Sequence, residues 1–234
     1  MKHSQHIFPG FSIRSESTFD SFYTSTSVLL LKHTLLDLLD APMASAVYIC
    51  GDKDTGKSHL LQAVSNKAHD LNLTSLYLPL AEMQDFPASE VLEGLENIDV
   101  LCVDDVHCVA GNAAWEEQLF HLYNRRMQAQ TLTIYAANEL ALSLPLHLPD
   151  LKTRFTACLS FQLPILLDEE KIELLQHRSK LLGMNLNESC AQFIVNRSDR
   201  DLGALLDIIA KLDRASLQEG RKITVPFIKE IMQW

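Results

Sequence analysis

The chain has 234 residues, of which 47% are hydrophobic and 21% charged, a balance typical of globular proteins. Its 20 Lys and Arg against 30 Asp and Glu give a net charge of −10 at pH 7, which disfavours direct binding to the phosphates of nucleic acid. No apolar run approaches the roughly 20 residues that span a bilayer, and the five cysteines lie mostly in apolar segments, so we expect a cytoplasmic protein with reduced thiols and no membrane contact.

In residues 17–164, short apolar runs alternate with longer segments of helical pattern. Residues 1–16, which precede them, are expected to form a flexible peptide. The predicted strands are 46–50, 74–78, 99–103, 131–136 and 157–162. The clearest helix between strands is 114–128. Strands separated by helices form parallel sheets covered on both faces. The prediction is an α/β base with a five-stranded parallel sheet.

The first predicted strand is followed by GDKDTGKS, residues 51–58. A glycine, four residues and Gly-Lys-Ser between a strand and a helix predict a P-loop, whose backbone N–H groups and helix N-terminus bind phosphate. Lys57 is expected to reach the β- and γ-phosphates, and the Ser58 hydroxyl to ligand Mg²⁺. The other residues of this stretch expected to bind the nucleotide are Asp54, Thr55, Gly56 and His59.

Paired carboxylates, Asp104 and Asp105, end the apolar strand at 99–103. We expect Asp104 to hold Mg²⁺ through water and Asp105 to polarise an attacking water. The alternative is two solvated carboxylates at the start of a turn. The nearby Cys102, His107 and Cys108 do not have the spacing of a zinc site and are interpreted as core residues.

After Pro164 the strand signals stop, and residues 165–234 are expected to form a small all-helical lid. An acidic first turn and a closing glycine predict a helix over 168–183. Its apolar residues on one face are Ile172, Leu175 and Leu182. The expected N-caps of three further helices are Asn187, Asp199 and Thr224.

Six segments, in order, resemble the DnaA branch of the AAA+ superfamily. They are STFDSF, GDKDTGKSHLLQAV, DVLCVDDVH, EEQLFHLYNRRMQ, LHLPDLKTRF and RDLGALL. The resemblance implies an AAA+ base and lid that bind ADP or ATP with Mg²⁺. It also implies that Arg154 is the arginine finger, Arg200 the sensor II residue and Asn138 the sensor I residue, with Phe22 near the base of the nucleotide.

DnaA initiators carry an N-terminal interaction domain and a C-terminal DNA-reading domain, whereas this sequence starts close to the AAA+ module and stops after the lid. That arrangement resembles the Hda family of DnaA-related regulators, in which an N-terminal peptide docks on the β sliding clamp of DNA polymerase III. Gln5, Phe8 and Pro9 of QHIFPG match that peptide, although its final leucine is missing. The alternative for this segment is a disordered tail.

The resemblance to Hda proteins implies a negative regulator of replication initiation. With nucleotide bound, and with the clamp loaded on DNA, such a protein makes DnaA hydrolyse its ATP, so that Arg154 acts in trans. The partners expected are DnaA and the clamp, with DNA contacted only through the clamp, and a homodimer or larger homo-oligomer is possible. The chain's own ATPase activity is expected to be weak at most.

Three other interpretations stay open at this stage. A helicase loader would need an N-terminal helicase-binding domain, for which the residues before Phe19 leave no room. An independent DnaA-like ATPase is consistent with the intact Lys57, Ser58, Asp104 and Asp105. A DNA-binding adaptor is disfavoured by the net charge of −10.

Overall fold

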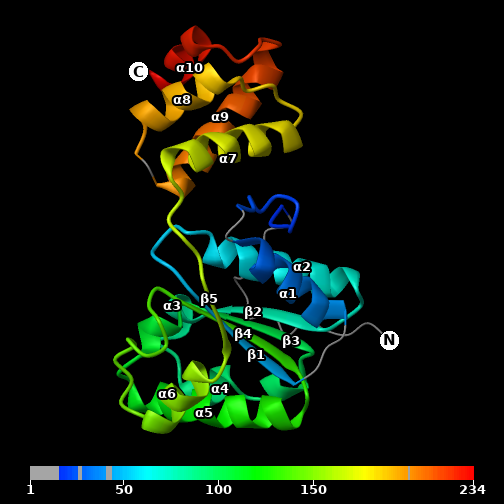
Figure 1. Cartoon of the computed structure of the whole chain (residues 1–234), viewed down its shortest axis with the longest axis vertical. Helices are drawn as coiled ribbons and strands as arrows, with labels where there is room; N and C mark the ends of the chain where they lie inside the picture. Colours follow the sequence, from blue (N-terminus) through cyan, green and yellow to red (C-terminus); the bar gives the residue numbers. More distant parts are fainter. Residues whose placement is uncertain (1–15, 26–27, 41–43, 200) are drawn as a thin grey trace. The chain divides into compact units, whose positions relative to one another are not determined.

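The structure is a computed structural model that describes residues 16–25, 28–40, 44–199 and 201–234. The chain divides into two compact units between Pro164 and Ile165. The first unit contains a parallel β-sheet flanked by helices, and the described part of the second is helical (Figure 1). None of the helices in the described ranges is long and apolar enough to cross a membrane.

The sheet of the first unit has five parallel strands in the order β2-β3-β4-β1-β5. They are β1 (Ser45–Cys50), β2 (Ser75–Pro79), β3 (Val100–Asp104), β4 (Leu132–Ala137) and β5 (Leu159–Gln162). Every residue of β3 and β4 is buried, as expected for central strands covered on both faces. The predicted fold class and all five predicted strands are confirmed, with boundaries that differ by one or two residues.

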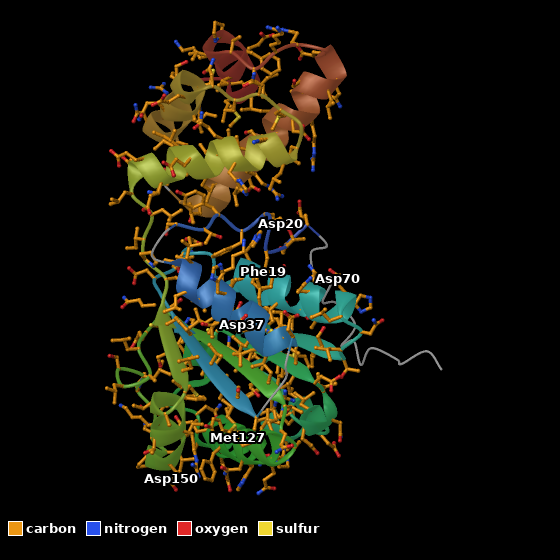
Figure 2. All side chains as sticks on the ribbon, turned by 45° about the vertical axis from the view of Figure 1, so that its right-hand side comes forward. Phe19, Asp20, Asp37, Asp70, Met127 and Asp150 are labelled. Atoms are coloured by element: carbon orange, nitrogen blue, oxygen red, sulfur yellow. The ribbon has the colours of Figure 1, made fainter. Side chains whose placement is uncertain are left out.

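Helices cover both faces of this sheet (Figure 1). One face carries α1 (Leu29–Asp40) and α2 (Lys57–Asp70). The other carries the short α3 (Leu80–Met83) and α4 (Ala88–Val91) together with α5 (Ala113–Gln128) and α6 (Pro149–Thr156). Figure 2 shows Asp37 and Asp70 on the first side, and Met127 and Asp150 on the second.

The alternation of side chains along each strand decides which face a residue joins. Ile49, Cys102 and Ile134 belong to the core under α2. Their neighbours Tyr48, Val103 and Tyr135 belong to the core under α5. Asp104, the last residue of β3, lies two residues after Cys102 and therefore points to the same face, toward α2.

Arg126 of α5 is a buried cation, 1% exposed, that joins the amino ends of β3 and β4. Its guanidinium donates to the Thr133 hydroxyl (2.6 Å) and to the carbonyls of Ile98 (2.9 Å), Leu132 (2.7 Å) and Leu95. Burial lowers the pKa of Arg126 to about 10, so the group stays protonated at neutral pH. The carbonyl acceptors, which include Leu95 in the short helix η2 (Leu95–Asn97), fix where the two central strands begin.

The second unit consists of α7 (Asp168–Leu181), α8 (Glu188–Arg197), α9 (Leu202–Glu219) and α10 (Val225–Met232). Its core is formed by apolar residues at helical spacing: Ile172, Leu175, Ile194, Leu205, Ile209, Leu212, Phe227 and Ile228. The helical composition predicted for this part of the chain is confirmed.

The predicted N-caps Asn187 and Thr224 are confirmed, because their side chains accept the backbone N–H groups of Cys190 and Phe227. The prediction of Asp199 is wrong. Asp201 caps α9 instead, accepting the N–H of Ala204 at 2.8 Å, because the helix begins two residues later than Asp199 would require. Leu182 does not join the buried face either, since α7 ends at Leu181 and Leu182 is 39% exposed.

Arg126→Met should destabilise the first unit by about 3 kcal/mol or more, because it leaves several buried acceptors without a donor. The chain has two tryptophans, so a Trp234→Phe background leaves the buried Trp115 as reporter of this unit in a urea titration. The control is Arg125→Met, whose half-exposed guanidinium pairs with Glu96 at 3.2 Å and should cost less than about 1 kcal/mol. Equal losses for the two variants would contradict this account.

Candidate functional site

The loop between β1 and α2, residues 51–56, is shaped by its glycines. A Cβ on Gly51 would lie 2.8 Å from both the Leu163 carbonyl oxygen and the Thr55 hydroxyl, so no larger residue fits there. Gly56 has φ 93° and is the N-cap of α2, a left-handed conformation that glycine adopts without strain. Asp54 also has a positive φ, of 63°. The loop therefore has the sharply bent backbone of a phosphate cradle at a helix N-terminus.

Lys57 begins α2 and lies folded back against this loop. Its Nζ donates to the carbonyl oxygens of Gly51 and Asp52, each at 2.7 Å, and the residue is 6% exposed. Burial lowers the pKa of Lys57, while the charges of Asp104 and Asp105 act in the opposite direction. Ser58, the next residue, is exposed in the first turn of the helix. The first turn of α2 thus presents an ammonium group and a hydroxyl beside the end of β3.

Asp104 is the last residue of β3 and is completely buried. Its Oδ2 accepts the hydroxyl of Tyr77 at 2.8 Å, and its Oδ1 accepts the backbone N–H of Asp105 at 2.9 Å. Asp105 is half-buried, with φ 55°. Burial and the adjacent Asp104 raise the pKa of Asp105, and His107 and Lys57 partly oppose the rise.

The residues of this group fit a nucleotide with its magnesium ion. The bent loop and the N-terminus of α2 suit phosphate, and the neighbouring carboxylate and hydroxyl are hard oxygen ligands of the kind that Mg²⁺ prefers when it also binds phosphate oxygens. In the described part of the chain, no three His, Cys, Asp or Glu side chains are grouped so that they could hold a metal ion.

Phe22 and His59 pack beside the loop. Phe22 is 8% exposed, and its Cε2 lies 3.2 Å from where a Cβ of Gly56 would be. The rings of Phe22 and His59 are 5.9 Å apart, and the Nε2 of His59 is 3.0 Å from the Ser21 hydroxyl. The segment that contains Phe22 therefore lies against the first turns of α2, which places both predicted residues next to the cradle.

Asn138 directly follows β4, at the same edge of the sheet as Asp104. Its Nδ2 is 2.8 Å from the Nε2 of His107, which belongs to the short helix η3 (Val106–Val109) after Asp105. The Nδ1 of His107 is buried and has no hydrogen-bond partner among the described residues. Sequence reasoning placed Asn138 but did not connect it to His107.

Arg154 lies in the last turn of α6 and is exposed. Its guanidinium carbon is 5.8 Å from the centre of the Tyr123 ring of α5, and no ion pair of Arg154 is found among the described residues. The next residue, Phe155, packs into the core under α5, whereas the apolar residues of α2 pack on the opposite face of the sheet. The structure therefore does not bring Arg154 together with Lys57.

Glu116 of α5 holds the start of α6. The carboxylate is 1% exposed and accepts two backbone N–H groups at 2.7 Å, one from Gly111 and one from Leu148. Leu148 is the N-cap residue of α6, and Gly111 follows η3. One buried carboxylate thus joins the segment after Asp105 to the helix of Arg154. Four further predicted residues, Gln5, Phe8, Pro9 and Arg200, lie outside the described residues.

Two models of known protein families match this chain. Residues 13–162 match the family model of the bacterial DnaA ATPase domain, and residues 168–232 match that of the Hda lid domain. The chain is an Hda-like, DnaA-related AAA+ protein. An uncharacterized protein of Haemophilus influenzae is 38% identical to this Hda-like protein over 218 residues, which cover 93% of this chain and 94% of the relative.

Solved structures share the fold of this Hda-like protein at low sequence identity. Domain III of the Thermotoga maritima replication initiation protein DnaA is 20% identical, with a TM-score of 0.78 and coverage of 95% of this chain and 98% of that one. AMPPCP-bound DnaA from Aquifex aeolicus is 18% identical (TM-score 0.71; 89% and 69% covered). The Thermotoga maritima RuvB branch migration motor is 17% identical (TM-score 0.68; 95% and 73% covered).

Glu116→Gln should loosen the start of α6, because an amide cannot accept both N–H groups and its own NH₂ faces a donor. We expect a loss of about 1–3 kcal/mol in unfolding free energy and faster hydrogen exchange at the Leu148 amide. Glu117→Gln is the control, since Glu117 is exposed and faces His121 at 3.8 Å. Unchanged exchange at Leu148 in the first variant would show that Glu116 does not hold α6.

Proposed function

We propose that this Hda-like protein is a negative regulator of replication initiation that promotes hydrolysis of the ATP bound to DnaA. The observation that carries the proposal is the position of Arg154, which is exposed and separated from the chain's own phosphate cradle by the sheet. An arginine in that position is available to a nucleotide on another molecule. Its guanidinium would stabilise charge that develops on the γ-phosphate during hydrolysis.

The chain's own cradle would hold ADP or ATP with Mg²⁺. Lys57 and the N–H groups from Asp54 to Gly56 would bind phosphate, and Ser58 and Asp104 would hold the metal, Asp104 through water. Phe22, Thr55, His59, Asn138 and Arg200 complete the proposed nucleotide contacts. The ion would neutralise phosphate charge. In this proposal the nucleotide acts as a structural switch for the base and lid and is not hydrolysed for energy.

The proposed partners are DnaA and the β sliding clamp of DNA polymerase III. Gln5, Phe8 and Pro9 would dock on the clamp, and DNA would be contacted only through it, which agrees with a chain whose net charge is −10. A homodimer or larger homo-oligomer would be a further way to bring Arg154 to a neighbouring nucleotide.

An independent DnaA-like ATPase is the second candidate function. It is favoured by the paired carboxylates Asp104 and Asp105 at the end of β3, which both lie near Lys57. Burial lowers the pKa of Lys57, and the charges of these two carboxylates partly offset that decrease. Asp105 would then orient the attacking water, and its raised pKa suits a group that takes up a proton.

Lys57→Ala should weaken ADP binding by at least about 10-fold, because a charge-assisted contact to phosphate is lost. The increase in melting temperature that ADP produces by linkage should shrink accordingly. Lys53→Ala is the matched control, since Lys53 lies in the same loop and is exposed. If calorimetry gives the two variants the same ADP affinity, Lys57 is not the lysine that binds the phosphates.

Arg154→Ala should bind ADP and the clamp as the wild type does and yet fail to stimulate hydrolysis of DnaA-bound ATP, because its contribution arises only in the transition state. The measurement is turnover of ATP preloaded on DnaA, in the presence of clamp-loaded DNA. Arg125→Ala, an arginine of the same unit paired with Glu96, should keep full stimulation.

Three results would count against the proposal in this assay. If Arg154→Ala stimulated hydrolysis of DnaA-bound ATP as strongly as the wild type, Arg154 would not be a trans-acting arginine finger. Full stimulation by a chain lacking residues 1–11 would place the clamp contact elsewhere. Rapid ATP turnover by the wild-type protein alone, without any effect on DnaA, would favour the independent ATPase.

A further inference from the structure

Tyr77 of β2 lies next to Asp104 because of the register between β2 and β3. Tyr77 pairs with Cys102, and Pro79, two residues later, pairs with Asp104. Residues two apart on a strand share a face, so Tyr77 and Asp104 are diagonal neighbours on the face covered by α2, within reach of a tyrosine side chain. The phenol oxygen is 2.8 Å from Oδ2 of Asp104, a good hydrogen-bond distance.

This hydrogen bond is one of two that determine how the Asp104 carboxylate is turned. The other comes from the backbone N–H of Asp105, which a change of the Asp105 side chain leaves in place unless the new residue is proline. An ionised carboxylate only accepts hydrogen bonds, so the phenol acts as the donor. Gln62 and Ser58, both on α2, also hydrogen-bond to this phenol. The phenol thus lies between the proposed metal carboxylate and the helix of the P-loop.

We propose that Tyr77 is a positioning residue for the metal side of the nucleotide site: its hydroxyl holds Asp104 in the orientation that a nucleotide-bound Mg²⁺ requires. The inference rests on the nucleotide part of the proposed function and adds a residue that the P-loop and Asp-Asp motifs do not contain. It makes Tyr77 responsible for the Mg²⁺ dependence of nucleotide binding and leaves phosphate binding to the loop and Lys57.

The physical reason is the cost of misplacing a buried carboxylate. Asp104 is fully buried, so the loss of a donor leaves one of its oxygens with an unmet hydrogen bond, and we expect the side chain to turn toward another donor. A carboxylate that has turned no longer presents the same oxygen to the water shell of the metal. Groups that hydrogen-bond to direct metal ligands commonly change metal affinity by about 10–100-fold when they are removed, and because Asp104 acts through water we expect an effect at the lower end of that range.

The sheet supplies a matched control for the loss of a phenol hydroxyl. Tyr135 of β4 is completely buried, and the side chain near its hydroxyl is Thr133 of the same strand, not Asp104. It lies on the opposite face, in the core under α5. Tyr135→Phe removes the same atom as Tyr77→Phe from the same sheet without touching Asp104.

The experiment measures ADP affinity by calorimetry with Mg²⁺ and with EDTA for the full chain and the two variants. For Tyr77→Phe we expect wild-type affinity in EDTA, which also shows that the variant is folded, and an Mg²⁺-induced gain smaller by about 10-fold. For Tyr135→Phe both values should equal those of the wild type. A titration of Mg²⁺ at fixed ADP should give a higher midpoint for Tyr77→Phe alone.

The outcomes separate this inference from the proposed function. A wild-type Mg²⁺ gain in Tyr77→Phe, or an equal loss with and without Mg²⁺, overturns the positioning role but leaves the cradle in place. Absence of ADP binding by the wild-type protein in both conditions overturns the nucleotide part of the proposed function together with the inference. Failure to stimulate DnaA, with the expected Mg²⁺ behaviour, contradicts the regulatory role alone.

Discussion

The buried carboxylate of Asp104 is the constraint on which the rest of the site depends. A charged group that is buried in the protein must be compensated by hydrogen-bond donors and by opposite charge. Here Tyr77 and the Asp105 N–H supply the donors, and Lys57 lies close enough to be influenced by the carboxylate's charge. These contacts come from β2, from the residue that follows β3 and from α2, so the register of the sheet and the start of the P-loop helix are tied to a single side chain.

The sheet separates two functions that the proposal gives to the same chain. The phosphate cradle belongs to the face covered by α2, while Arg154 belongs with α5 and α6 on the other face. Within the second of these faces, Glu116 joins the segment that follows η3 to the start of α6, since it accepts the backbone N–H groups of Gly111 and Leu148.

Much of this arrangement could be predicted from the sequence because local patterns determine it. Apolar runs and helical spacing located the strands and the lid helices, and the glycine spacing located the cradle. The helix start at Asp201 could not be separated from Asp199, since both are good caps and tertiary packing selects between them. Tyr77, His107 and Glu116 were missed for another reason: their partners are set by strand register and loop packing, which leave no motif in the sequence.

The central claim is that this chain keeps its own nucleotide and acts on that of DnaA. The most direct measurement is single-turnover hydrolysis on clamp-loaded DNA with radiolabelled ATP placed in one protein at a time. The account predicts that label on DnaA is converted to ADP rapidly once the two proteins meet, while label on this chain stays largely unconverted over the same time. Rapid conversion of the label on this chain, with no change in the label on DnaA, would contradict it.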